Sequence, residues 1–316
     1  MSTNVSYVPG VAVATLHSKN LEQRVALAAV VIPFVALVIA IVLLWKKAVG
    51  ATELLLLAGM YTATLMGITV GYHRLISHRA FETMPVIRNV LAILGSMAAQ
   101  GPVLHWAAIH RRHHSFADRP GDPHSPHMHG EGPKGILRGL WHAHTGWLFV
   151  HEITDWAHYA PELLRDKAIF TISQLYFLWI AIGLLIPTVI GGLAAGDLHG
   201  ALYGFLWGGL VRISLVHHTT WSVNSICHVY GSRPYKIHDR AANNPIMAIL
   251  AFGEGWHNNH HAFPTSAMHG FRWWQIDLSG YVIRTLQALG LAWNLKLPFI
   301  TRSAGQARYQ LKRRQM

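Results

Sequence analysis

Histidines gather at three places in the sequence, with spacings that suit metal binding. His73 and His78 are five residues apart, and the segments 110–114 and 257–261 both read HxxHH. In an α-helix, residues at i, i+3 and i+4 project from one face, so each HxxHH motif delivers three imidazoles to a common volume. A five-residue spacing does not share such a face, and we therefore expect the helix that carries His73 and His78 to kink or unwind near Arg74.

The three groups supply eight imidazoles, which are too many for one ion. They are His73, His78, His110, His113, His114, His257, His260 and His261. Zinc takes four ligands in a structural site and usually three plus water in a catalytic one, so eight imply two metals. Iron suits an imidazole-rich site with a position open for oxygen. Soluble di-iron carboxylate bundles need two Glu-x-x-His motifs and two further glutamates, whereas we find only Glu254 with His257 in this spacing. We predict a histidine-built site for two iron ions.

The composition places this chemistry in a membrane. Of the 316 residues, 52% are hydrophobic and only 13% are charged, against roughly 25% charged in an average globular protein. A single cysteine, Cys227, excludes a disulfide framework and a thiolate metal cage, because each needs at least two thiols. With 23 histidines against 14 acidic residues, imidazole is the ligand that the chain offers in quantity. An integral membrane metalloprotein is expected.

Four apolar stretches are long enough to cross a hydrocarbon core of about 30 Å. They cover residues 25–45, 54–72, 168–190 and 198–216. We expect Pro187 and the pair Gly191–Gly192 to end the third helix, and the shorter stretch 90–103 to lie at the interface. The prediction is an all-α, single-domain protein with four transmembrane helices in two hairpins. A helical cap, formed by residues 73–167 and 217–316, carries the histidines.

With four spans, the cap and both chain ends lie on one side of the membrane. This side carries every lysine and arginine except Lys46 and Lys47, so we expect it to be cytoplasmic. The first 24 residues contain no basic region followed by an apolar core, and no cleavable signal peptide is expected. The net charge of +12 favours anionic lipids, an acidic electron donor or a phosphate-bearing substrate over nucleic acid.

The segments GYHRLISHR, HRRHH and GEGWHNNHH resemble the three histidine boxes of the membrane-bound fatty acyl desaturases. The resemblance runs from about residue 54 to residue 277. It includes GDPHSP at 121–126 and TWSVNSICH at 220–228. The pattern is similar to bacterial members that resemble the stearoyl-CoA type, which introduces a Δ9 cis double bond. It implies an integral protein of the bacterial inner membrane.

The resemblance implies a ninth histidine ligand, His228, and a metal-bound water held by Asn224. It also implies how the ligands divide between the metals. One iron would take His73, His78, His110, His114 and His261. The other would take His113, His228, His257, His260 and the water held by Asn224.

The reaction that the resemblance implies uses reduced di-iron and O2 to remove two hydrogens from an acyl chain, with two electrons supplied from outside. Animal acyl-CoA members have a charged pair before the second box, where this chain has Ala107, Ala108 and Ile109. The substrate is therefore an acyl-CoA or, alternatively, an acyl-lipid. No heme-binding HPGG segment occurs, so we expect a separate donor, either ferredoxin, rubredoxin or a cytochrome b5-like protein with its reductase.

Two other functions are alternatives for a chain with these histidines. A membrane hydroxylase or ketolase shares the histidine boxes, and a fatty acid hydroxylase remains the alternative with the same metal site. A histidine-based metal transporter would place ionisable ligands inside the spans, whereas residues 54–71 and 168–196 contain none.

A narrow apolar tunnel must hold the acyl chain, because selective oxidation requires that one carbon reaches the metals. Trp106, Trp147, Trp221 and Trp256 are candidates for its wall, or else interface anchors. On the second span, Leu65 lies roughly 12 Å and Tyr61 roughly 18 Å before His73 at 1.5 Å per residue. In the family the equivalent positions cap the tunnel, so Tyr61 and Leu65 are candidates for a chain-length gauge, with lipid-facing or packing roles as the alternative.

Overall fold

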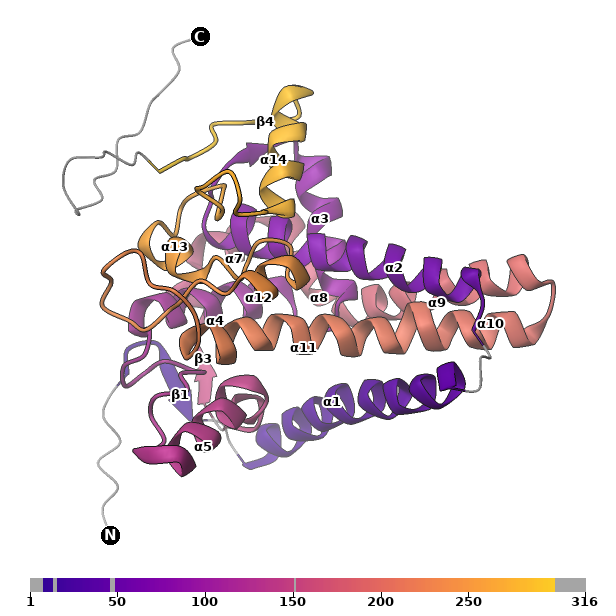
Figure 1. The fold of residues 1–316 in the computed structure, drawn as a ribbon, viewed down its shortest axis with the longest axis horizontal. Coiled ribbons are helices and arrows are strands. Elements are labelled where there is room, and N and C mark those ends of the chain that lie inside the picture. Colours follow the sequence, from indigo (N-terminus) through magenta and orange to yellow (C-terminus); the bar gives the residue numbers. More distant parts are fainter. Residues whose placement is uncertain (1–7, 14–15, 46–48, 151, 299–316) are drawn as a thin grey trace.

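Long helices run side by side along one direction of the molecule, and shorter elements gather at one of their ends (Figure 1). A computed structural model describes residues 8–13, 16–45, 49–150 and 152–298. The expected loop with Lys46 and Lys47 and both chain ends lie outside these residues. The elements that carry the histidines lie together at the left end of the long helices in Figure 1.

The described chain is mostly helical. The α-helices are α1 (Leu16–Trp45), α2 (Ala51–Met66), α3 (Pro85–Met97), α4 (Val103–Phe116), α5 (Gly132–His144), α6 (Trp156–Tyr159), α7 (Pro161–Arg165), α8 (Lys167–Gln174), α9 (Tyr176–Ala195), α10 (Leu198–Gly204), α11 (Arg212–Ser225), α12 (Pro245–Leu250), α13 (His257–Ala262) and α14 (Leu278–Ala288). Two π-helices, η1 (Gly67–Ser77) and η3 (Phe205–Val211), and two 3₁₀-helices, η2 (Gly146–Phe149) and η4 (Ile226–His228), complete the helical elements of this part.

Two small antiparallel sheets tie distant segments of the cap together. β1 (Val11–Val13) pairs with β3 (Glu152–Thr154), and β2 (Glu82–Thr83) pairs with β4 (Ala292–Trp293). Each sheet has two strands of two or three residues. They hold the segment before α1 and the segment after α14 against the body of the cap.

The second predicted span is one continuous helical run, α2 followed by η1. Its last eleven residues form a π-helix, whose hydrogen bonds join residues five apart. The backbone N–H of His78 accordingly donates to the carbonyl of His73 at 3.0 Å. We expected a kink or an unwound turn near Arg74, but the helix instead widens its turns. Widening brings positions i and i+5 onto one face, which is what the five-residue spacing of His73 and His78 requires.

The third predicted span, 168–190, is wrong at both ends. The helix is interrupted between α8 and α9, and α9 continues past Pro187 to Ala195. The turn comes at Gly196, whose φ of 76° is left-handed, and Asp197 then caps α10. The expected turn glycine Gly191 is a packing residue, because a Cβ there would lie 2.4 Å from the carbonyl oxygen of Gly200. Small residues thus let the backbones of α9 and α10 touch.

The fourth predicted span, 198–216, is helical but continues through α10, η3 and α11 to Ser225. Arg212 is fully buried within this run. Its guanidinium donates to the backbone carbonyls of Met97, Gly183 and Gly208. These acceptors replace the water that a charged side chain loses on burial.

Three helical segments of the described residues are long and apolar enough to cross a membrane. They are Gln23–Leu44, Ala51–Ser77 and Tyr176–Ala195. The run from Leu198 to Ser225 is not among them, because its arginine, histidines and glycines make it less apolar. The stretch 90–103, expected at the interface, is not one helix: it is divided between the end of α3, a turn and the start of α4. α3 itself is a shorter apolar helix. In Figure 1, α3 and α14 cross the direction of the long helices.

Candidate metal centre

The nine expected metal ligands converge on one region from four elements. η1 and its last turn supply His73 and His78, and α4 supplies His110, His113 and His114. The short η4 supplies His228, and α13 supplies His257, His260 and His261. Each α-helix contributes its i, i+3 and i+4 positions from one face, as expected from the HxxHH motifs.

The nine histidines form two groups, and within each group all ligand atoms lie within 4.8 Å of one another. The first group is His73, His78, His110, His114 and His260. The second group is His113, His228, His257 and His261. The expected division is therefore wrong for two residues, because His260 belongs to the first group and His261 to the second. Adjacent residues on a short helix point in different directions, and sequence alone does not fix which way α13 is rotated.

The ring nitrogens within the groups face one another at short distances. The Nε2 atoms of His73 and His260 are 3.1 Å apart, and those of His260 and His114 are 2.9 Å apart. In the second group, Nε2 of His228 lies 3.0 Å from Nε2 of His257. A cation held by these nitrogens would satisfy lone pairs that otherwise repel each other.

Four carboxylates set the orientation of four of these rings. Nδ1 of His73 lies 2.6 Å from Glu254, and Nδ1 of His113 lies 3.0 Å from Asp122. Asp118 and Asp239 each lie 2.9 Å from Nδ1 of His228 and His261, respectively. A carboxylate that accepts the Nδ1 proton leaves the Nε2 lone pair free for a metal.

The residues present therefore fit metal ions. Nε2 of His113 and Nε2 of His261 are buried, and neither has a hydrogen-bond partner among the described residues. Both atoms face other histidines of the second group, and both rings are held at Nδ1 by a carboxylate. A buried acceptor without a partner is costly, and a metal ion would remove that cost.

Burial keeps most of these imidazoles neutral, which is the state that binds metal. It lowers the pKa of His78, His110, His114 and His257 well below 6.5, and repulsion from neighbouring histidines lowers it further. For the carboxylates, burial and the neighbouring histidines shift the pKa in opposite directions. Burial raises the pKa of Asp118, but its hydrogen bond and attraction to His228 outweigh burial, so the pKa lies below its usual value.

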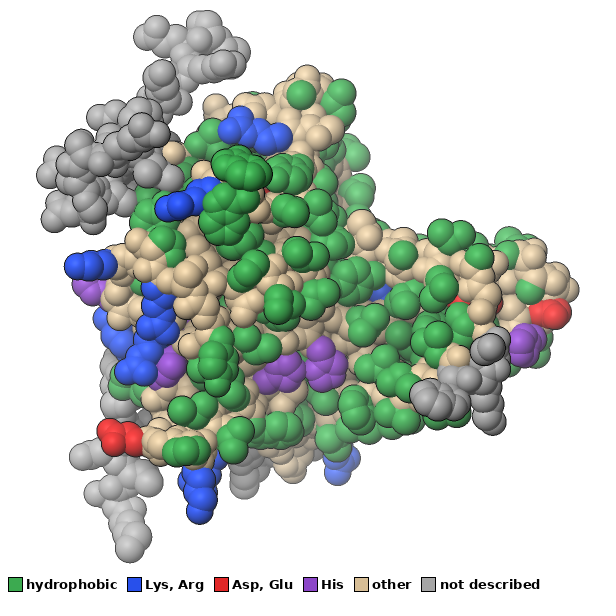
Figure 2. Space-filling view, in the orientation of Figure 1, with side chains coloured by type: hydrophobic (Ala, Val, Ile, Leu, Met, Phe, Trp, Pro, Cys, Tyr) green, Lys and Arg blue, Asp and Glu red, His purple; other side chains and the backbone are tan. Residues whose placement is uncertain are grey.

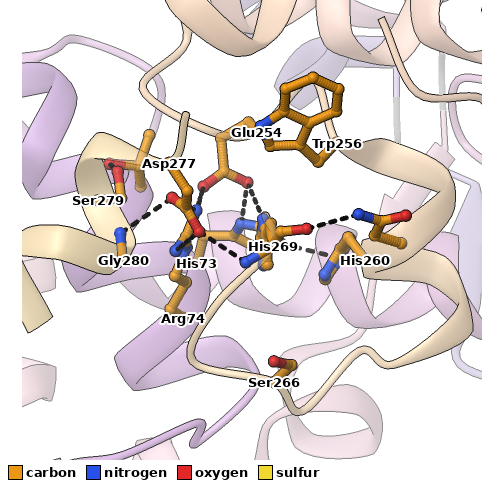
Figure 3. A network of polar contacts seen from close by, with 12 residues as sticks. His73, Arg74, Glu254, Trp256, His260, Ser266, His269, Asp277, Ser279 and Gly280 are labelled. Atoms are coloured by element: carbon orange, nitrogen blue, oxygen red, sulfur yellow. Dashed lines mark hydrogen bonds and ion pairs between the residues drawn. The ribbon is translucent and has the colours of Figure 1, made fainter. Parts of the chain in front are cut away.

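Arg74 anchors a second network behind the first group (Figure 3). Its guanidinium donates to Asp277 at 2.9 and 3.0 Å and to Glu254 at 3.1 and 3.2 Å, and all three side chains are buried. Asp277 also accepts from the backbone N–H of His269 and caps α14. One arginine thus joins η1, the turn before α13 and the start of α14.

Several residues of this network were not expected from the sequence. Asp118, Asp122 and Asp239 lie in loops with no fixed spacing to their histidines. His269 is fully buried, and its ring lies 4.5 Å from that of His260. It belongs to none of the three boxes, and no motif identified it.

A cavity of about 500 Å³ lies against both groups, with His73, His110 and His257 in its wall. Three of the expected tunnel residues, Trp106, Trp147 and Trp221, line it, and so does Asn224. The second span contributes Ile68 and Thr69 to this wall. The ring of Trp106 stacks on that of His110 at 4.9 Å.

The other three expected tunnel residues lie outside this wall. The hydroxyl of Tyr61 donates to the carbonyl of Leu250 and lies 3.1 Å from Thr219, beside a smaller cavity of about 270 Å³. Leu65 is buried in the core. Trp256 is buried and donates from Nε1 to the carbonyl of Ile276.

Known proteins match this chain over most of its length. Residues 48–294 match the family model described as fatty acid desaturase. The chain is 49% identical over 284 residues to the hex-5-enoyl-[acyl-carrier protein] acetylenase of Moorena producens (strain JHB), covering 89% of this chain and 88% of that one. It is 39% identical to the sn-1 stearoyl-lipid 9-desaturase of Anabaena variabilis (73% and 79% covered) and 37% identical to the icosanoyl-CoA 5-desaturase of Limnanthes douglasii (75% and 63% covered).

Proposed function

The chain belongs to the fatty acid desaturase family, and we propose that it removes two hydrogens from neighbouring carbons of a saturated, carrier-bound acyl chain, leaving a cis double bond at Δ9. The observation that carries this proposal is that both histidine groups contribute to the wall of one cavity. The overall reaction consumes O2, two electrons and two protons and releases two waters.

The ligands that we propose for two iron ions are the nine histidines, divided as the two groups. Bound iron would supply the oxidising power that amino-acid side chains lack. The protein's own part is positioning. Glu254, Asp118, Asp122 and Asp239 hold the Nδ1 protons of four rings, so that the Nε2 atoms face inward.

The cavity wall orients the acyl chain in this proposal. Trp106 stacks on His110 and presents an apolar surface beside the first group. Asn224 lies on the same wall as His257, and we assign its amide the role of holding a water near the second group. Trp147 and Trp221 belong to the same wall, whereas Tyr61, Leu65 and Trp256 lie outside it.

We also propose an arrangement in the membrane. The three apolar helices and the run from Leu198 to Ser225 make four spans in two hairpins, with the histidine cap on the cytoplasmic side of the inner membrane. The long helices of Figure 1 lie side by side, and the cap lies at one end of them, which supports this arrangement. The buried carbonyl partners of Arg212 support placing that residue among the spans.

The carrier of the acyl chain is the open part of the proposal. The sequence resemblance favours CoA, whereas the names of the relatives include lipid, CoA and acyl-carrier-protein substrates. The 49% identity to an acetylenase also favours testing a chain that already carries a terminal double bond. A separate protein supplies the electrons in all three cases.

Mass spectrometry of acyl chains from an expressing host tests the proposal. The expected product lacks two hydrogens, whereas gain of one oxygen would assign the hydroxylase instead. Purified protein with iron, O2 and a chemical reductant is then given stearoyl-CoA, stearoyl-lipid, stearoyl-acyl carrier protein or hex-5-enoyl-acyl carrier protein. An inactive His257→Ala variant is the control. Conversion of none of the three stearoyl substrates by the wild type, or conversion of hex-5-enoyl-acyl carrier protein alone, would contradict the proposal, because a six-carbon chain has no Δ9 position.

A further inference from the structure

Five exposed cations lie around the loop between η4 and α12. They are Arg119, Arg233, Lys236, Arg240 and Arg272, and we name them the basic face. None of the five forms an ion pair with any residue that the structure describes. In Figure 2, lysine and arginine side chains gather at the left of the molecule, over the region where Figure 1 shows the loops beside α13.

The carboxylates of this region are turned inward. Asp239 lies in the middle of the loop, yet its Oδ2 lies 2.9 Å from Nδ1 of His261. Asp118 precedes Arg119, and its Oδ2 lies 2.9 Å from Nδ1 of His228. The two carboxylates thus contact histidines, while the five cationic side chains remain exposed on the surface. This segregation leaves a basic face directly over the second histidine group.

The basic face is joined to the second group by two short paths. Asp239, in the loop itself, contacts His261. The backbone N–H of Arg240 donates to Oδ2 of Asp118 at 2.8 Å, and the same oxygen contacts His228. Only one carboxylate therefore separates the surface loop from each of two proposed metal ligands.

The position of the basic face favours a soluble partner over the bilayer. The long helices run away from this end of the molecule in Figure 1, and the face lies at the opposite end from their α9–α10 turn. If these helices cross the membrane, the face points to the aqueous side. An approaching partner would meet five cations, while Asp118 and Asp239 beneath them contact histidines.

We propose that the basic face is where an acidic electron-carrier protein docks and delivers electrons through the second histidine group. This inference rests on the proposed function, because the reaction needs two electrons from outside. The donor gives them in two one-electron steps and is oxidised twice per double bond. Opposite charge on the two surfaces speeds encounter, and this effect weakens as salt rises.

Binding and electron transfer are measured on the whole iron-loaded protein in nanodiscs of neutral lipid. The probes are ferredoxin, rubredoxin and cytochrome b5, each with net negative charge. The test variant is Arg233→Glu/Lys236→Glu. The matched control is Lys134→Glu/Arg138→Glu, which makes the same charge change on exposed positions of α5. Iron content and the thermal denaturation midpoint of both variants should equal those of the wild type.

The active probe is the one that binds the wild type and is oxidised by it. At low ionic strength, its association rate with the test variant and its rate of anaerobic oxidation by that variant should be about tenfold or more below the wild-type rates. The control variant should match the wild type, and the difference should shrink near 1 M salt. Equal loss in both variants, no loss in the test variant, or no salt-dependent binding of any probe by the wild type would overturn the proposal.

Two further outcomes separate this proposal from its alternatives. If the test variant instead loses binding to vesicles of anionic phospholipid while keeping probe binding, the face recognises lipid and the proposal is wrong. Turnover driven by a chemical reductant bypasses the donor, so it should be unchanged in the test variant. Failure of that turnover in the wild type would overturn the proposed desaturation while leaving the docking measurement interpretable.

Discussion

Nδ1 of His73 lies 2.6 Å from Oε2 of Glu254, which joins the end of a long helix to the turn before α13. The other oxygen of Glu254 accepts two hydrogen bonds from Arg74. Burial raises the pKa of Glu254, but the neighbouring His73, His269 and Arg74 outweigh burial and lower it well below its usual value. The carboxylate is therefore ionised, and it fixes the His73 ring with Nε2 toward the other histidines.

Replacing Glu254 with Gln should weaken metal binding without unfolding the protein. The amide keeps the size of the side chain but removes the charge that orients His73, and loss of such a partner costs roughly 10–100-fold in metal affinity. Iron per chain, measured after dialysis against graded chelator, should fall at lower chelator concentration. Glu131→Gln, an exposed change ahead of α5, should retain wild-type iron, and equal retention in both variants would show that Glu254 is not needed.

The grouping of His260 with His73 predicts the metal content of single variants. Wild-type protein purified without added metal should hold about two iron ions per chain, because the histidines form two groups. His260→Ala should disturb the same Mössbauer site as His73→Ala, and His261→Ala the same site as His257→Ala. His199→Ala, on α10, should leave both sites intact. If His260→Ala instead behaves like His257→Ala, the grouping is wrong, and one tight zinc without iron would remove the di-iron proposal.

Local geometry explains which parts of the site were predictable. The HxxHH motifs predicted that their histidines converge, because residues three and four apart lie one helical turn from each other. The division of His260 and His261 depends on how α13 docks, which is a tertiary property. Asp118 and Asp239 reach their histidines from loops, so no spacing signals them. Pro187 and Gly191 misled the prediction of the third span: Pro187 lies inside α9 without ending it, and Gly191 lets α9 and α10 approach closely.

Asn224→Ala tests the proposed water-holding role. The side chain lines the cavity with His257, so its loss should lower kcat at least about tenfold, in the range typical for removal of one positioned polar group. The thermal denaturation midpoint should change little, because Asn224 makes no side-chain hydrogen bond within the described part of the chain. Ser222→Ala on the same helix is the control. Full activity of Asn224→Ala would rule out the role.

His269 predicts a pH dependence of stability in the metal-free protein. Burial, aided by the nearby Arg74 charge, lowers the pKa of His269 to about 4 from 6.5. Between these values the unfolded chain binds a proton that the folded chain does not, so the free energy of unfolding falls as pH falls from 6.5 to 4. The full shift is worth up to about 3 kcal/mol. At pH 7.5 and above this contribution no longer changes.

The matched variant is His269→Gln, which does not titrate. Other buried histidines still destabilise both proteins at acidic pH. The denaturation midpoint of the variant in detergent should nevertheless fall less steeply between pH 6.5 and 4 than that of the wild type. Parallel pH profiles for the two proteins would show that His269 is not held neutral by the fold.

Tyr61 and Leu65 remain our proposal for the chain-length gauge, and the structure suggests how they would act. Ile68 and Thr69 line the large cavity, while Tyr61 lies about two helix turns earlier in the run and lines the smaller one. Thr219, which contacts Tyr61, borders the smaller cavity, and the next residue, Thr220, borders the larger. In our proposal the Tyr61 ring separates the two spaces. Tyr61→Ala should let them merge and shift the product profile toward longer acyl chains.

Leu65→Ala should shift the profile in the same direction, with a loss of stability of about 2–5 kcal/mol because the side chain is buried. Tyr61→Phe is the control, since it keeps the ring and removes only the hydrogen bonds to Leu250 and Thr219, so its profile should match the wild type. Gas chromatography of products from mixed chain lengths gives the profile, and mass spectrometry locates the double bond. The bond should keep its distance from the carboxyl end, because the head group sets that distance. An unchanged profile in both alanine variants would remove these residues from the gauge, and a double bond that moves with chain length would mean that the protein measures from the methyl end.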